Sequence, residues 1–399
     1  MPFMPIAPYD TKGTMNPELI ELAENVCYES AMLAGNHNPV ILNEIREMLR
    51  IVNSYYSNRI ESEGTHPISI EKAMRKEFSQ NSKEKKLQML SLAHIETQKE
   101  MEKWLSGNHF ASPYEAEFIR EIHRDLYSRP GMDAFLHIEH GDLSVEMVPG
   151  QFRDMPVEIG RHIAPDASRV AGLMSEFSHL YSRVHSATLS TRLIHTLASH
   201  HRLVWIHPFF DGNGRVSRLA LDGAILSNGL QGYGLWNISR GLSRNVNRYK
   251  EMLAYADMPR QGAMDGRGTL SAKALELFVR FMLEMASDQV AYMKKYLRLD
   301  ELSGRLERYV ALSRNGLLDI EPLPKHSEKV FKHLLLYGES PRGDISSAAG
   351  ISKRGSSDLI RELITREYIA SDSEKGAVRL RFSAHLSPAV FPELYPGQL

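Results

Sequence analysis

Residues 205–223, WIHPFFDGNGRVSRLALDG, combine side chains that could handle phosphate groups. Arg215 and Arg218 stand three positions apart, so a helix would place both guanidinium groups on one face. Gly-Asn-Gly at 212–214 permits a turn whose N–H groups converge where that helix begins, and partial positive charge there favours anions. Two guanidinium groups beside a helix N-terminus suit a polyphosphate ligand better than a ligand with a single carboxylate.

Two further residues of this stretch could complete a site for phosphoryl chemistry. Asp211 supplies an oxygen ligand that suits Mg²⁺, which would bridge phosphate oxygens. A neutral imidazole at His207 could accept the proton of an attacking hydroxyl. A buried core segment would not use these residues together, because buried charge must be paired. The combination therefore indicates a functional site rather than an ordinary turn.

The segment HPFFDGNGR, residues 207–215, resembles the signature of the Fic-domain family at every specified position. The resemblance implies transfer of AMP from ATP to a protein hydroxyl, with release of pyrophosphate. It implies that His207 is the general base and that Asp211 holds Mg²⁺. It also implies nucleotide contacts, with Arg218 on the γ-phosphate, from Phe209, Asp211, Gly212, Asn213, Gly214, Arg215 and Arg218. Phe209 could in addition pin the loop to the core.

A later stretch, ISRGLSRNVNRYKEML at 238–253, could close the nucleotide pocket. Members of the family often place an asparagine and a tyrosine near the adenine in this region. The resemblance therefore makes Asn247 and Tyr249 the candidates for contact with the base.

An upstream stretch, YSNRIESEG at 56–64, resembles the inhibitory helix of the family through Ser57 and Glu61. A carboxylate at Glu61 could pair with Arg218 and occupy the position of the γ-phosphate, which would hold ATP in a non-productive pose. A surface glutamate on an amphipathic helix is the plain alternative. The sequence thus predicts a chain that restrains itself without a separate antitoxin.

The register of this inhibitory segment leaves a second option open. Ser62 stands where the family expects glycine or asparagine, so an offset register could use Glu63 instead of Glu61. If the helix continued, Glu63 would lie about 200° around its axis from Glu61 and would face elsewhere.

Another stretch, VPGQFRDMPVEIGRHIAP at 148–165, resembles the flap of the family. An ordinary hairpin would have a similar composition. A hairpin beside the site can add its edge to an extended target segment and position the hydroxyl. The expected partner is a protein with a Ser, Thr or Tyr hydroxyl, which includes this protein itself.

Helical periodicity dominates the remainder of the chain, so the expected fold is mainly α: a Fic-type helical bundle with a small β-hairpin flap. The expected segments are an N-terminal helical region at 1–110 with its inhibitory helix near 51–64, a catalytic core at 111–258, a helical connector at 259–325 and a winged helix-turn-helix at 326–399.

The expected winged helix-turn-helix could bind DNA or dock a protein. Lys353, Arg354 and Arg361 could reach phosphate or base edges, but acidic residues nearly balance the basic ones in this segment. A regulator with a nucleotide-sensing Fic-like domain is therefore the alternative to a transferase. Removal of AMP from a modified protein is a further alternative, and a homodimer is compatible with the sequence.

Bulk composition narrows the remaining classes. The 399 residues carry a net charge of −1, 42% hydrophobic and 24% charged residues, and a single cysteine, so no intramolecular disulfide can form. No apolar run reaches the roughly 20 residues of a membrane span, and the N-terminus lacks the features of a signal peptide. We expect a cytoplasmic protein that makes no membrane contact.

A metal hydrolase is the last alternative among enzymes. Its ligands would come from His200, His201, His207 and Asp211. Adjacent histidines point to different faces of a helix, which disfavours this set as a single metal site.

Overall fold

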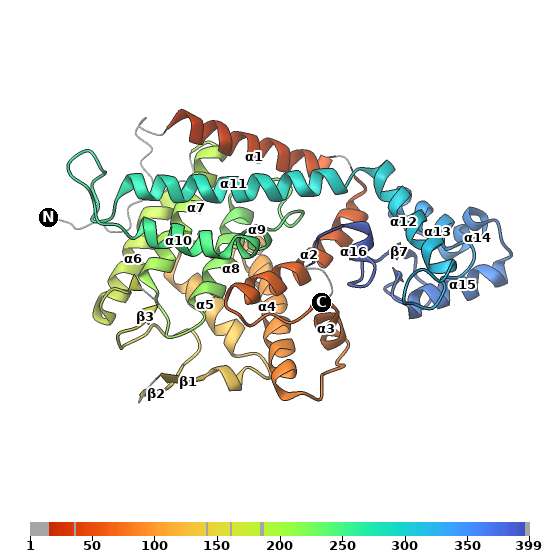
Figure 1. The fold of residues 1–399 in the computed structure, drawn as a ribbon, viewed down its shortest axis with the longest axis horizontal. Coiled ribbons are helices and arrows are strands. Elements are labelled where there is room, and N and C mark those ends of the chain that lie inside the picture. Colours follow the sequence, from red (N-terminus) through yellow and green to blue (C-terminus); the bar gives the residue numbers. More distant parts are fainter. Residues whose placement is uncertain (1–15, 36, 141–142, 160–161, 184–186, 396–399) are drawn as a thin grey trace. The chain divides into compact units, whose positions relative to one another are not determined.

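A computed structural model of the chain describes residues 16–35, 37–140, 143–159, 162–183 and 187–395 (Figure 1). Contacts divide the chain into two compact units. The first takes its described residues from Met1–Ala31, Asn53–Tyr233 and Asn237–Gln289, and the second takes them from Met32–Val52, Gly234–Trp236 and Val290–Leu399. The boundaries expected from the sequence, at residues 110, 258 and 325, stay predictions.

Helices make up most of the described chain, as predicted, and their order can be followed in Figure 1. The N-terminal half contains α1 (Pro17–Gly35), α2 (Pro39–Ile60), α3 (Pro67–Met74), α4 (Ser82–Ser106), α5 (Ala116–Tyr127) and α6 (Val170–Tyr181), with short 3-10 helices at Asp133–Phe135 and Ala167–Arg169. Next come α7 (Leu189–Ile206), α8 (Asn213–Ser227), α9 (Ile238–Arg244), α10 (Val246–Ala256) and α11 (Ala272–Tyr296).

The core of the first unit lies among α4, α5, α6, α7 and α8. Helix α5 shows why these segments pack: Phe118, Ile122 and Leu126 recur at helical spacing and are 0% exposed. Helix α7 packs against α8, and the short loop between them carries the signature residues. The core therefore fixes both helices that flank this loop.

Two small hairpins accompany the helices of the first unit. Strand β1 (His137–His140) pairs antiparallel with β2 (Leu143–Glu146), with Ile138 opposite Val145. Strand β3 (Glu158–Ile159) pairs antiparallel with β4 (His162–Ile163) inside the segment at 148–165 where the sequence predicts a flap. The predicted hairpin is thus present, whereas its role toward a target stays a prediction.

The second unit contains the C-terminal elements, and from α13 to β7 their order is helix, strand, helix, helix, strand, strand. They are α12 (Leu299–Arg314), α13 (Ser327–Tyr337), β5 (Glu339–Ser340), α14 (Arg342–Ala349), α15 (Lys353–Thr365), β6 (Ile369–Ala370), β7 (Val378–Leu380) and α16 (Ser387–Val390). The three strands form one sheet in the order β5-β7-β6. This order is compatible with the expected winged helix-turn-helix, which stays a prediction together with its role.

An ion pair joins the C-terminal sheet to the part of α2 that belongs to the same unit. Arg379 on β7 donates Nε to the buried Glu44 carboxylate at 2.6 Å. Burial raises the pKa of Glu44, against the opposing effect of Arg379. Residues 32–52 are therefore structural partners of the C-terminal module.

Within the described part of the chain, none of the helices combines the length and apolar character needed to cross a membrane.

Acidification is expected to destabilise the first unit. Burial lowers the pKa of His94, His123 and His200 to about 3, and that of His207 to about 4. In an unfolded chain these imidazoles would titrate near 6.5, so between about pH 6.5 and 4 the unfolded state binds more protons than the native state. The contribution of these neutral imidazoles to the free energy of unfolding is complete above about pH 6.5, and it is lost as the pH falls. Circular dichroism should show a lower unfolding midpoint at pH 5 than at pH 7.5.

His94 offers a matched test of this acid sensitivity. Its side chain is 0% exposed, and neither ring nitrogen has a hydrogen-bond partner among the described residues. His94→Met should therefore reduce the difference between the midpoints at the two pH values, whereas His109→Gln, at an exposed position, should not. A wild-type midpoint that stays constant from pH 7.5 to 5 would contradict the prediction.

Candidate active site

The loop between α7 and α8 is held by a left-handed turn at His207. His207 caps the C-terminus of α7 with φ 50° and ψ 64°, and its N–H donates to the Leu203 carbonyl at 3.1 Å. Phe209 follows, is 0% exposed, and stacks on His123 with ring centroids 3.9 Å apart. The structure thus agrees with the expectation that Phe209 pins the loop to the core.

Asn213 closes this loop through its side chain. Its Oδ1 accepts from the Phe209 N–H at 2.9 Å, and its Nδ2 donates to the Phe209 carbonyl at 2.8 Å. Both amide groups are therefore committed to the loop. The prediction that Asn213 cradles phosphate can hold only for its backbone N–H, at the start of α8.

Two glycines around Asn213 lie in close contact with other elements. Gly212 has φ 77°, and a Cβ there would come far inside contact distance of the Tyr127 hydroxyl. Gly214 lies against Glu61, and a Cβ there would come far inside contact distance of its carboxylate. The second close approach shows that the α2 end and the loop are packed directly together.

Arg218 is held by both residues of the predicted inhibitory motif. Its Nε donates to Ser57 Oγ at 3.0 Å, and its Nη2 donates to the Ser57 carbonyl at 2.9 Å and to Glu61 Oε1 at 2.7 Å. The Arg218 side chain is 2% exposed, and that of Glu61 is 33% exposed. Burial alone would raise the pKa of Glu61, but Arg218 and Arg215 outweigh it and lower this pKa. The structure therefore brings Ser57, Glu61 and Arg218 together as predicted.

Arg215 is occupied by a second carboxylate. Its Nε donates to Asn58 Oδ1 at 3.0 Å, its Nη1 donates to the Tyr127 hydroxyl at 2.9 Å, and its Nη2 pairs with Glu63. Glu63 was expected to face away from the site, and that expectation is wrong. Arg215 and Arg218 are thus both paired with acidic side chains from the same short segment.

The end of α2 explains the position of Glu63. The helix stops at Ile60, and Ser62 adopts a left-handed φ of 64°. The Glu63 N–H then bonds back to the Asn58 carbonyl at 2.9 Å. A left-handed residue is the position that favours glycine or asparagine, which accounts for the residue types expected where Ser62 stands.

His207 is held in the form that a base requires. Burial lowers its pKa to about 4, and nearby His162 and Arg153 act in the same direction. Arg153 is 2% exposed and donates Nε to the His207 carbonyl at 2.7 Å. Its backbone N–H also donates to the Pro208 carbonyl at 2.9 Å. The imidazole is consequently neutral at pH 7, and its backbone is fixed from the segment that precedes β3.

Asp211 reaches solvent at the start of α8. The protein around it raises its pKa by desolvation, while a bond from the Gly212 N–H opposes this. No group of three or more His, Cys, Asp or Glu that could hold a metal occurs among residues 16–395 outside their undescribed gaps. A single exposed carboxylate nevertheless fits Mg²⁺ that arrives bound to phosphates, because such ions need only one or two protein ligands.

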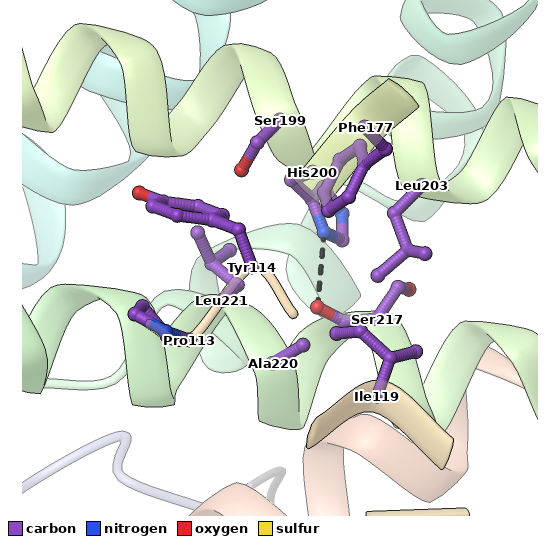
Figure 2. A pocket seen from close by; sticks show the side chains of 10 residues that line it. All are labelled: Pro113, Tyr114, Ile119, Phe177, Ser199, His200, Leu203, Ser217, Ala220 and Leu221. Carbon is purple, nitrogen blue, oxygen red and sulfur yellow. Dashed lines mark hydrogen bonds between the residues drawn. The ribbon is translucent and has the colours of Figure 1, made fainter. Parts of the chain in front are cut away.

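The two adjacent histidines of α7 have separate partners, which disagrees with a metal cluster. His200 Nε2 lies 2.7 Å from the Tyr249 hydroxyl, and His201 Nε2 lies 3.0 Å from Asp257 Oδ1. Below His200, a cavity of about 10 Å³ has room for one water at most (Figure 2).

Tyr249 is misplaced for the adenine contact predicted from the sequence. Its side chain is 2% exposed, and its hydroxyl interacts with His200 and Arg218. A ring enclosed in this way contacts Arg218, and neither of its faces is open for stacking with an adenine ring. Asn247 is exposed, and its contact with adenine stays a prediction.

Several residues of the site were missed from the sequence. Asn58, Glu63, Tyr127 and Arg153 contact the signature residues, yet no local spacing marks them. The second glutamate in YSNRIESEG was the only available signal, and it was weighed as an alternative register rather than as a partner acting beside Glu61.

The comparisons with known proteins agree with this geometry. Residues 113–223 match the Fic/DOC family. Proteins named protein adenylyltransferase Fic from Drosophila virilis and Drosophila melanogaster are 41% and 42% identical over 80 residues. These matches cover 20% of this chain and 16% of each relative, so they concern a small part of either protein.

Solved structures extend the likeness in fold. A Fic family protein from Desulfovibrio desulfuricans aligns over 93% of this chain and 98% of its own, with a TM-score of 0.53 and 18% identity. A Fic-domain protein from Bacteroides thetaiotaomicron aligns over 68% of this chain and 96% of its own, with a TM-score of 0.51 and 17% identity. At these identities the likeness shows the fold alone. The match at 113–223 and the site that these residues build show that this part of the chain is a Fic domain.

Proposed function

We propose that the protein transfers AMP from ATP to a hydroxyl side chain of a protein, and that the end of α2 restrains this activity. The observation that carries the proposal is the placement of a neutral imidazole, a helix N-terminus and two guanidinium groups around one loop. Such a set suits a reaction that depends on positioning and charge neutralisation.

In the proposed reaction, His207 accepts the proton of the target hydroxyl as its oxygen attacks the α-phosphorus. A new oxygen–phosphorus bond forms, the bond from the α-phosphorus to the bridging oxygen breaks, and pyrophosphate leaves. Arg218 would bind the γ-phosphate and Arg215 another phosphate, while N–H groups at the start of α8 face the negative charge. Asp211 would hold Mg²⁺, which neutralises phosphate charge when bound.

The proposed restraint follows from the partners of the two arginines. A γ-phosphate and the Glu61 carboxylate would compete for Arg218, and a second phosphate and Glu63 would compete for Arg215. Nucleotide can bind productively only after these contacts are released. The described state therefore corresponds to the restrained form in this proposal.

His207→Ala should lower transfer from α-labelled ATP by about 10²–10⁴-fold, because it removes the general base. ATP affinity by calorimetry should change little, since the imidazole faces the hydroxyl rather than the phosphates. His179→Ala, at an exposed position on α6, is the matched control. Because the His207 pKa is about 4, the rate should hold from pH 8 to 6 and decline as the pH approaches 4. Wild-type transfer by His207→Ala would refute its role as the base.

Glu61→Gly should raise self-modification by about ten- to a hundredfold, because a charge-assisted pair of this kind contributes roughly 1.5–3 kcal/mol. Glu63→Gly should also activate, since it releases Arg215, and the double variant should be the most active. The matched control is Glu77→Gly, which removes an exposed carboxylate paired with Arg75. If none of the three activating variants exceeds wild type, the α2 end does not restrain transfer.

The choice of label separates the transferase from the alternative of a nucleotide-sensing regulator. Transfer places the α label and not the γ label in protein. Binding without transfer, together with a sequence-selective DNA shift, would favour the regulator. The exposed face of α15 carries both signs of charge, with Lys353 and Arg354 near the Asp358–Arg361 pair, so it gives DNA no clear preference.

A further inference from the structure

His162 joins the hairpin strand β4 to two helices beside the catalytic loop. Its Nδ1 lies 2.9 Å from Asp257 Oδ2, just after α10, and its Nε2 lies 3.0 Å from the Trp205 carbonyl near the end of α7. Trp205 is two residues before His207, and the rings of His162 and His207 are 6.4 Å apart. A single side chain thus links the predicted flap to the segment that carries the base.

The partners of His162 determine how many protons its ring must carry. A carboxylate and a backbone carbonyl can only accept hydrogen bonds, so both ring nitrogens must donate if both bonds are made. A neutral imidazole has one N–H and would leave one of these contacts unmade. The arrangement is therefore satisfied only by the doubly protonated ring.

Asp257 is the carboxylate that contacts His162, and basic groups lie next to this pair. Arg202 Nη1 lies 3.1 Å from His201 Nδ1, which leaves the proton of neutral His201 on Nε2, facing Asp257 Oδ1 at 3.0 Å. Asp257 thus faces both histidines, and His201 Nε2 also lies 3.1 Å from the Leu253 carbonyl. Burial would raise the pKa of Asp257, but the two histidines outweigh this and lower it to about 2. The other cation facing the site is Arg153, which donates to the His207 and Pro165 carbonyls.

Because His162 points inward, the next side chain of the strand, Ile163, points outward. Consecutive side chains of a strand point to opposite faces, and Ile163 is 79% exposed next to the inward His162. An exposed apolar side chain on a hairpin edge suits an extended protein segment that adds to that edge.

We propose that His162, with both ring nitrogens protonated, is a positioning residue that holds β4 against the end of α7 and thereby aligns the docking edge of the hairpin with His207. The alignment of a target rests on the proposed function, whereas the protonation of His162 does not. The residue acts through the hairpin and does not touch the reacting atoms.

Nuclear magnetic resonance on the full chain tests the protonation directly. In ¹⁵N-histidine protein near neutral pH, the His162 ring, assigned by its loss in His162→Gln, should show two protonated nitrogens. Asp257→Asn should convert that ring to the neutral form, whereas the control His179→Gln should leave it unchanged. A singly protonated His162 in wild-type protein would overturn the proposal, even if the protein proved inactive toward ATP.

The destination of AMP tests the alignment, in the Glu61→Gly chain with α-labelled ATP and Mg²⁺. Attack by a protein hydroxyl needs the hairpin edge, whereas attack by water needs only the base and yields free AMP. Adding His162→Gln should lower the ratio of labelled protein to free AMP by about tenfold, and adding His179→Gln should not. An unchanged ratio would overturn the positioning role. This includes the case in which labelled protein and free AMP decrease in proportion while the unfolding midpoint also falls, because the ratio then stays the same. If Glu61→Gly itself consumes no ATP, the proposed function fails, and the protonation measurement still decides the state of His162.

Discussion

Two guanidinium groups, Arg215 and Arg218, lie 2% exposed on one face of α8 and impose the main electrostatic constraint on the first unit. A buried cation without partners is strongly unfavourable, so the protein must surround each group with acceptors. Ser57, Asn58 and Tyr127 supply neutral acceptors, and Glu61 and Glu63 supply the compensating charge. The two carboxylates directly follow the end of α2 and reach the surface, where they can be replaced. The neutral partners belong to the packed core.

This division gives a physical account of how binding and restraint can share the same groups. Phosphate oxygens would supply the negative charge that the two glutamates supply in the described state. The Glu61 and Glu63 side chains are 33% and 35% exposed, so water can solvate them once they leave. Serine at position 62 adds a left-handed residue where glycine would be free of strain, and this places the turn that carries both glutamates under some conformational cost.

His207, the proposed base, is constrained by a different set of contacts. Arg153 and His162 come from the two sides of the predicted flap, and both bind backbone carbonyls next to His207. Asn213 and the stack of Phe209 on His123 fix the rest of the loop. The loop around His207 is therefore built on core elements, whereas Arg215 and Arg218 are covered by residues at the end of α2. In the proposed mechanism, binding of a target and release of the restraint would thus depend on separate parts of the first unit.

The sequence by itself determined the residues that could perform the chemistry and the helices that flank them. The spacing of Arg215 and Arg218, the glycines around Asn213 and the helical periodicity are local features, and local features are readable from order along the chain. The resemblance at 56–64 also singled out Ser57 and Glu61, and both bind Arg218. Only the tertiary structure decided that Glu63 turns back to Arg215, that Tyr249 is enclosed next to Arg218, and that Arg153 and His162 contact the backbone around His207. Each of these depends on where a helix ends or on contacts between residues that packing alone brings together, and neither leaves a periodic signal in the sequence.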